Sequence, residues 1–245
     1  MGMEKVRTVF LKALWQDLVM MNFEVDPSVL LNYLPPFTVL DIFNGKVLVS
    51  IVGFMFNNTT VFGLNWPYHT HFEEVNLRFY VKYFDGNLWK RGVVFVSEIV
   101  PSPIIAFTAN KLYHEQYRHL QMKHERKETP GELTLSYQWK LGQKWNSLGV
   151  TAGTELKEIM AQSEEEFILE HYWGYNTFNK TTTVEYGVEH RRWQIRDVKN
   201  WHLDADITAL YGAAFVPFLT VEPTSVFLAN GSDVIIRKPT FIKKG

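Results

Sequence analysis

The chain has 245 residues, of which 46% are hydrophobic and 21% charged, so it can bury a sizeable core. Its 25 basic and 26 acidic residues leave a formal net charge of -1, so no overall basic field would attract nucleic acid, and we expect no such partner. The absence of cysteine excludes disulfides, thiolate metal sites and a cysteine nucleophile. All-β folds often fill this length as one unit, and we expect a single domain over residues 1–245.

The N-terminal residues do not have the pattern of a targeting segment. Met1 to Trp15 lacks the compact apolar region and the small-residue cleavage site of a secretory signal. The longest nearly apolar stretch, Ala209 to Leu219, is shorter than the ~18 to 20 residues of a membrane helix, and Gly212 and Pro217 interrupt it. We therefore expect a cytoplasmic protein without a membrane partner.

Alternation of apolar and polar residues dominates the chain and predicts many strands. The predicted strands are 17–25, 46–56, 69–83, 89–100, 133–140, 182–198, and 225–229 with 233–237 around a turn at Asn230-Gly231. The charged segment 123–132 ends in Thr129-Pro130-Gly131 and predicts an exposed hairpin loop. The predicted helices are 28–34 (capped by Asp26 and begun by Pro27), 103–117, 163–170 and 204–211. The fold class is therefore mainly β with a few peripheral helices, arranged as a barrel or sandwich.

The common motifs for phosphate, dinucleotide, serine-hydrolase and zinc-protease chemistry are missing, so we expect no cofactor. The strongest metal candidate is the pair His69 and His71, two residues apart on one strand face, with Glu73 next on that face. A histidine pair without a well-placed third ligand is a weak signal. We expect a structural or surface role for this pair and no metal site.

A polar stripe runs along the strand at 69–83. Alternation places Phe72, Glu74, Asn76, Arg78 and Tyr80 on one face, while the intervening residues are mainly apolar. One interpretation is a polar face in water and an apolar face on the core. The other is a polar face that lines the inside of a small barrel, as in barrels that hold one ligand.

The spacing within the stripe bears on these alternatives. Glu74 and Arg78 have Cα atoms about 13 Å apart at ~3.3 Å per residue, so a direct ion pair would need both side chains fully extended. Asn76 or a bound ligand is expected between them. The aromatic residues Phe72 and Tyr80 at the ends of the stripe fit a lined pocket better than an open surface.

Glu98 lies on an apolar face with Val94, Val96 and Val100. Burial there would disfavour the charged carboxylate and raise its pKa, which suits a proton donor or base. The alternative is a strand-end glutamate that turns into solvent before Pro101.

The sequence resembles the YqjF-like family of uncharacterised conserved proteins, domain of unknown function 2071, along nearly its whole length. The matching residues are 22–27 (NFEVDP), Pro35, Gly45, 49–54, 72–81, Leu112-Tyr113 with Tyr117, 170–175 (EHYWGY), 188–190 with Trp193, and 225–229 with Gly231-Ser232. That family is similar in fold to acetoacetate decarboxylase. The resemblance implies a twisted antiparallel β-barrel or cone with helices outside and a central cavity, and it favours the lined-pocket interpretation of the stripe.

The sequence departs from acetoacetate decarboxylase where the chemistry lies. Those enzymes use a Schiff-base lysine in a Pro-Lys-Lys setting. When residues 112–118 are laid over that stretch, Tyr117 falls near the place of the lysine, Lys111 lies beyond Leu112, and Gln16 stands near the place of the cavity arginine. The resemblance therefore implies the fold and the cavity without the lysine chemistry.

These observations predict a lumen that binds a small organic molecule, an anion because Arg78 offers a bidentate fork to a carboxylate. If the protein is an enzyme, it is a lyase or isomerase acting beside a carbonyl. The alternatives are a non-catalytic binding or sensing protein and a purely structural polar network; the sequence leaves a homo-oligomer open. The predicted catalytic residues are Glu74 (acid/base), Arg78 (substrate clamp) and Tyr117 (hydrogen-bond donor), and the predicted ligand-binding residues are Phe72, Asn76, Tyr80, Glu98 and Tyr113.

Overall fold

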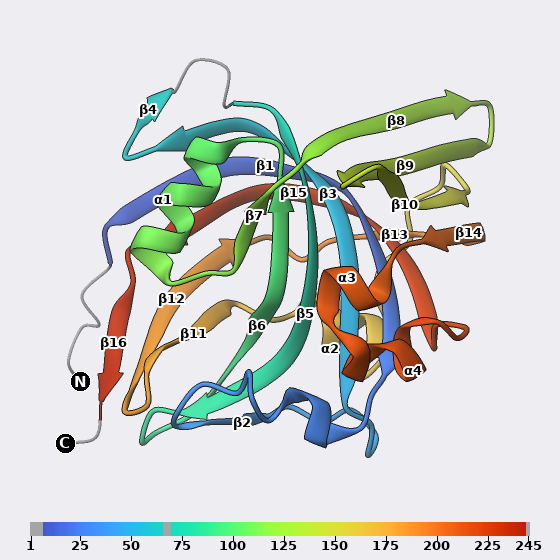
Figure 1. The fold of residues 1–245 in the computed structure, drawn as a ribbon. Coiled ribbons are helices and arrows are strands. Elements are labelled where there is room, and N and C mark those ends of the chain that lie inside the picture. The colour runs from blue at the N-terminus through green and yellow to red at the C-terminus, as the bar shows by residue number, and fades with distance from the viewer. Residues whose placement is uncertain (1–6, 66–69, 244–245) are drawn as a thin grey trace.

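The structure is a computed structural model that describes residues 7–65 and 70–243. Most of the chain forms one large, strongly curved sheet, with a smaller sheet and short helices packed around it (Figure 1). The strands of the large sheet are β1 (Val9–Glu24), β2 (Thr38–Leu40), β3 (Leu48–Val61), β4 (Leu64–Asn65), β5 (Phe72–Phe84), β6 (Trp89–Val100), β7 (Tyr117–His119), β11 (Trp173–Asn179), β12 (Thr182–His190), β13 (Ile195–Arg196), β15 (Ser225–Arg237) and β16 (Thr240–Lys243).

The smaller sheet has the strand order β14-β10-β9-β8. Its strands are β8 (Gln121–Thr129), β9 (Glu132–Leu141), β10 (Lys144–Ala152) and β14 (Val198–Asp204). The helices are α1 (Pro103–Tyr113), α2 (Glu164–Leu169), α3 (Ile207–Tyr211) and α4 (Val216–Leu219), with short 3-10 turns η1 (Pro27–Leu30) and η2 (Ala213–Phe215). Within the described ranges, no helix has the length and apolar character required to cross a membrane.

The large sheet curves back on itself. Its main path runs β15-β1-β3-β5-β6-β11-β12, and β12 also pairs with β15. Most neighbours are antiparallel, but β6 pairs in parallel with β7 and with β11. The predicted fold class, mainly β with a few peripheral helices, is confirmed.

The two faces of β5 pack into different parts of the core. Val75, Leu77, Phe79 and Val81 face outward and belong to the apolar cluster that includes the buried side chains of β9, β10 and α3. The alternate residues face the inside of the curve. The period of two in the sequence therefore separates an outer apolar layer from the interior of the sheet.

The predicted helices are shorter than the sequence pattern suggests. Asp26 caps the first one as predicted, but the helical geometry is a single 3-10 turn at Pro27–Leu30. The predicted helix at 103–117 ends at Tyr113, because His114 adopts a left-handed conformation with φ of 56°. The residues after His114 then turn toward β6, where β7 adds a parallel strand.

A loop, a strand and a turn predicted from the sequence differ from the structure. The predicted loop at 123–132 is mostly strand β8, which is exposed and joins β9 through a turn at Pro130-Gly131. The predicted strand at 182–198 divides into β12, β13 and the start of β14, because the chain leaves the sheet after His190 and Trp193 turns its ring into the interior. The predicted turn at Asn230-Gly231 does not form.

Gly231 instead continues strand β15 in an unusual conformation. It has φ of +80° and lies opposite Gln16 of β1. A Cβ atom added to it would lie 2.0 Å from the backbone oxygen of Trp15. Glycine is therefore required here by a close approach of two strands, which the sequence cannot distinguish from a turn.

Replacing this glycine should be far more destabilising than replacing a glycine in an open turn. We expect Gly231→Ala to lower the free energy of unfolding by roughly 3 kcal/mol or more. The reason is that the cost of a positive φ and the cost of a clash with the backbone of Trp15 are both present. Gly142→Ala is the control: its φ is +60°, nothing lies within 4 Å of its added Cβ, and about 1 kcal/mol is expected. Urea unfolding of both variants measures the difference; equal losses would contradict the close-approach explanation.

Candidate functional site

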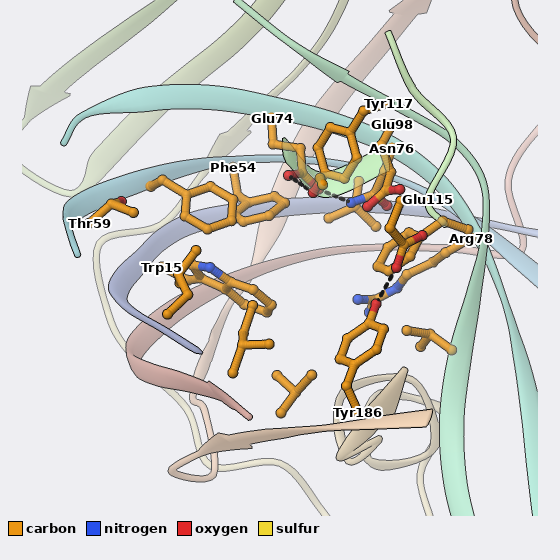
Figure 2. A pocket seen from close by; sticks show the side chains of 18 of the residues that line it. Trp15, Phe54, Thr59, Glu74, Asn76, Arg78, Glu98, Glu115, Tyr117 and Tyr186 are labelled. Carbon is orange, nitrogen blue, oxygen red and sulfur yellow. Dashed lines mark hydrogen bonds between the residues drawn. The ribbon is translucent and has the colours of Figure 1, made fainter. Parts of the chain in front are cut away.

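A cavity of about 230 Å³ lies inside the curve of the large sheet. Its walls come from β1, β3, β5, β6 and β12, with α1 and the segment after it on one side. Figure 2 shows the polar side chains gathered in one region and aromatic rings in another. The stripe residues Glu74, Asn76 and Arg78 line this cavity and are buried, with 2%, 1% and 8% of their surfaces exposed.

Glu74 is held by two donors. The Asn76 side-chain amide donates to Oε1 of Glu74 at 2.9 Å, and the Tyr117 hydroxyl donates to Oε2 at 2.9 Å (Figure 2). Asn76, one of the two occupants that the strand spacing allows, thus lies next to Glu74 on the side toward Arg78. Tyr117 reaches the same carboxyl group from β7, which is paired with β6 at Glu98.

A second pair of carboxyl groups adjoins the first. The side chains of Glu98 and Glu115 hydrogen-bond to each other, and the Tyr186 hydroxyl donates to Oε1 of Glu115 at 2.5 Å. Glu98 and Glu115 are 2% and 7% exposed, so Glu98 does not turn into solvent at the strand end. The sequence does not mark Glu115 as a cavity residue, because its pattern predicts one continuous helix over 103–117.

A bulge in β6 aims Glu98 into the cavity. Leu77 of β5 pairs with Ser97, but Arg78 pairs with Phe95, so Val96 is an extra residue on β6. Phe95 and Glu98 consequently line the cavity, whereas Val96 packs into the outer cluster. The sequence-based face shared by Glu98 and Val96 was therefore wrong, although the prediction that Glu98 has a raised pKa agrees with its buried position.

Burial changes the proton affinity of all three carboxyl groups. It raises the pKa of Glu74 to about 7, against the lowering effect of the hydrogen bonds from Asn76 and Tyr117. It raises the pKa of Glu98 well above its usual value, helped by the nearby charges of Glu115 and Glu74. The pKa of Glu115 is raised by burial as well. Burial therefore favours the protonated forms of these carboxyl groups. Burial also raises the pKa of Tyr117, so its hydroxyl remains a donor.

Arg78 is a buried cation with few partners. Its Nη2 atom contacts the Met20 sulfur at 3.9 Å, and its guanidinium lies 5.7 Å from the centre of the Tyr80 ring. Its Nε atom is buried without a hydrogen-bond partner, and no described carboxylate forms an ion pair with it. A buried guanidinium in this state is strongly stabilised by any anion that reaches it.

The remaining predicted residues lie in different places. Phe72 lines the cavity and stacks on Phe56 with ring centres 4.6 Å apart. Tyr80 does not line the cavity: its hydroxyl lies 2.5 Å from the Ser50 hydroxyl, and its ring packs 4.8 Å from that of His171. Tyr113 ends α1, and its side chain lies outside what the structure describes.

Only one member of the candidate metal pair lies among the described residues. His69 lies outside the described residues, and His71 is exposed, with Nδ1 2.9 Å from the Asn57 side-chain oxygen. Over residues 7–65 and 70–243, no group of three or more metal-ligating side chains was found. His171 and His190 line the cavity instead, and burial lowers the pKa of both, that of His171 to about 4.

Solved structures that are similar to this chain include acetoacetate decarboxylases and an enduracididine biosynthesis enzyme. The acetoacetate decarboxylase of Legionella pneumophila subsp. pneumophila str. Philadelphia 1 has a TM-score of 0.63 and 14% identity, over 99% of this chain and 92% of that one. An acetoacetate decarboxylase-like enzyme from Sphingomonas wittichii RW1 has a TM-score of 0.65 and 13% identity, over 97% and 95% of the two chains. The enduracididine biosynthesis enzyme MppR complexed with pyruvate has a TM-score of 0.64 and 11% identity, over 98% and 93%. The chain therefore has the acetoacetate decarboxylase fold.

Within that fold, the chain belongs to the family of the domain of unknown function 2071, described as an uncharacterized conserved protein, whose model matches residues 12–233. The uncharacterized protein YqjF of Bacillus subtilis (strain 168) is 31% identical over 113 residues. That match covers 46% of this chain and 45% of the relative, so it spans less than half of the relative's length. The predicted family resemblance is confirmed.

The protonation of Glu74 predicts how stability depends on pH. Folded Glu74 keeps its proton up to about pH 7, whereas an ordinary glutamate releases it near 4.5. The folded state therefore binds more protons between these values, and the free energy of unfolding falls as pH rises through this window, on the order of 3 kcal/mol in total.

Glu74→Gln should remove this part of the pH dependence, because glutamine mimics the protonated side chain. Between pH 5 and pH 8 we expect the melting temperature of the variant to fall by roughly 5 to 10 °C less than that of the wild type. Glu222→Gln, at an exposed site, is the control and should follow the wild type. Parallel curves for Glu74→Gln and wild type would show that Glu74 titrates normally.

Proposed function

We propose that the cavity binds a small organic carboxylate or oxo acid and that Arg78 binds its carboxylate group. The observation that carries this proposal is the buried guanidinium of Arg78, which faces the cavity without an ion-pair partner among the described residues. Two parallel N–H donors of an arginine match the two oxygens of a carboxylate. That the MppR structure is described as complexed with pyruvate supports the same ligand class for a cavity in this fold.

The groups beside Arg78 suit proton transfer next to a carbonyl. Glu74, with its pKa raised to about 7, can both accept and donate a proton at neutral pH. Tyr117 supplies a hydroxyl donor for a carbonyl oxygen, and Asn76 fixes the orientation of Glu74. We propose a lyase or isomerase reaction in which Glu74 moves the proton and Tyr117 stabilises the oxygen where negative charge develops.

This chemistry does not use a Schiff base. None of the described residues that line the cavity is a lysine, and Lys111 on α1 is exposed. A phenol cannot replace a primary amine in forming an imine with a ketone, so Tyr117 cannot take over that reaction. The proposed role of Tyr117 is limited to hydrogen bonding.

A non-catalytic binding or sensing protein is the second candidate. It is favoured by the state of Glu74, since both carboxyl oxygens already accept a hydrogen bond, from Asn76 and Tyr117. A base held in this way must first give up one partner. Turnover of a panel of oxo acids separates the two candidates, because the binding protein leaves every member unchanged.

The binding step is tested by removing the guanidinium. In a panel of small carboxylates, at least one member should stabilise the wild type by RT ln(1 + [L]/Kd), about 2.7 kcal/mol at one hundred times Kd. Arg78→Met should gain much less, because methionine keeps the apolar stem and loses the charge. Arg118→Met on β7, at an exposed position, is the matched control and should respond like the wild type.

Two outcomes of this thermal-shift experiment would contradict the proposal. Equal shifts for wild type and Arg78→Met would show that Arg78 does not bind the anion. No shift in any protein would favour a polar network that serves only the fold.

A further inference from the structure

The cavity has a second, aromatic end. Trp15 of β1 lies edge-on to Phe54 and Phe56 of β3, with ring centres 5.1 and 5.6 Å apart, and Phe56 stacks on Phe72 of β5. All four line the cavity. In Figure 2, Trp15 and Phe54 lie on the side of the cavity away from Arg78 and Glu115. The proposed anion site occupies only one part of the enclosed space.

Strand β5 connects the two ends. Its inward face presents Phe72, then Glu74 and Asn76, then Arg78, over about 20 Å between the first and last Cα atoms at ~3.3 Å per residue. The long Arg78 side chain covers part of this length. A ligand whose carboxylate meets Arg78 and whose chain passes Glu74 would therefore continue toward Phe72 and Trp15.

The aromatic end leads to the surface between apolar residues. Phe62 and Ile104 both line the cavity, yet 53% and 51% of their surfaces are exposed, so they form part of its mouth. Phe62, directly after the end of β3, packs edge-on against Phe10 of β1, with ring centres 5.1 Å apart. An apolar mouth next to an apolar wall suits the tail of a ligand better than a second charged group.

We propose that the natural ligand is an amphipathic acid, with an alkyl chain or aryl group of several carbons attached to its carboxylate or oxo-acid head. This inference rests on the proposed function, because Arg78 binds the head. A three-carbon acid would leave the rings of Trp15, Phe54 and Phe56 uncovered. The cavity volume of about 230 Å³ exceeds the needs of such a small acid.

The test is the dependence of affinity on chain length. Acetate, butyrate, hexanoate and octanoate are titrated into the whole protein, and Kd is measured by calorimetry or from thermal shifts. Each added CH₂ group that becomes buried should lower Kd by about fourfold, so hexanoate should bind roughly tenfold or more tighter than butyrate. Octanamide, which keeps the tail and lacks the charge, should bind at least about tenfold more weakly than octanoate.

A pair of matched variants locates the tail. Trp15→Leu should weaken octanoate binding by about tenfold and change acetate binding by less than about twofold, because only the longer acid reaches that ring. Trp201→Leu makes the same substitution on β14, away from the cavity, and should leave both affinities unchanged. The series measured on the wild type does not depend on the folding of either variant.

The outcomes separate this inference from the proposed function. If short carboxylates bind through Arg78 and the affinity does not rise with chain length, the amphipathic ligand is wrong and the anion site stands. If octanamide binds as tightly as octanoate, Arg78 does not bind the head, and the proposed function and the inference both fail. Absence of binding by every acid would also overturn both.

Discussion

The burial of four ionisable side chains inside one curved sheet is the constraint on which the rest of the site depends. Arg78, Glu74, Glu98 and Glu115 are each no more than 8% exposed. A charge in such a place is costly unless it is paired or neutralised. Burial raises the pKa of the three carboxyl groups and so favours their neutral forms, whereas an arginine cannot give up its proton. Arg78 therefore keeps a positive charge at the cavity wall, for which the described residues supply no ion-pair partner.

Three local deviations from regular structure shape the cavity wall. The extra residue Val96 in β6 rotates Glu98 inward. The left-handed conformation of His114 ends α1 and turns Glu115 and Tyr117 toward the carboxyl group of Glu74. Gly231, at φ of +80°, lets β15 approach the backbone of β1 beside Trp15. The regular strands form the walls of the cavity. The irregular positions determine which side chains point into it.

The same division explains what could be predicted from the sequence. Alternation found the β5 stripe, because side chains on a strand alternate strictly between two faces, but it left open whether the stripe faces water or a cavity. The family resemblance favoured the cavity. Alternation gave the wrong face companions for Glu98, because a bulge in β6 shifts the pattern there. The residue types around the bulge do not reveal it. Alternation also missed Glu115, because nothing in the local composition marks the end of α1 at His114. Tyr80 lies on the inward face of β5 but does not line the cavity. Its hydroxyl contacts that of Ser50, and its ring packs against the ring of His171.

The central claim is that Arg78 binds the carboxylate of a ligand that lies along β5. A crystal structure of the protein with 2-oxooctanoate tests it most directly. The account predicts both carboxylate oxygens within about 3 Å of the Arg78 guanidinium, the oxo group beside Tyr117 and Glu74, and the chain against Trp15 and Phe54. A carboxylate bound elsewhere, or an Arg78 side chain turned out of the cavity with the ligand in place, would contradict it.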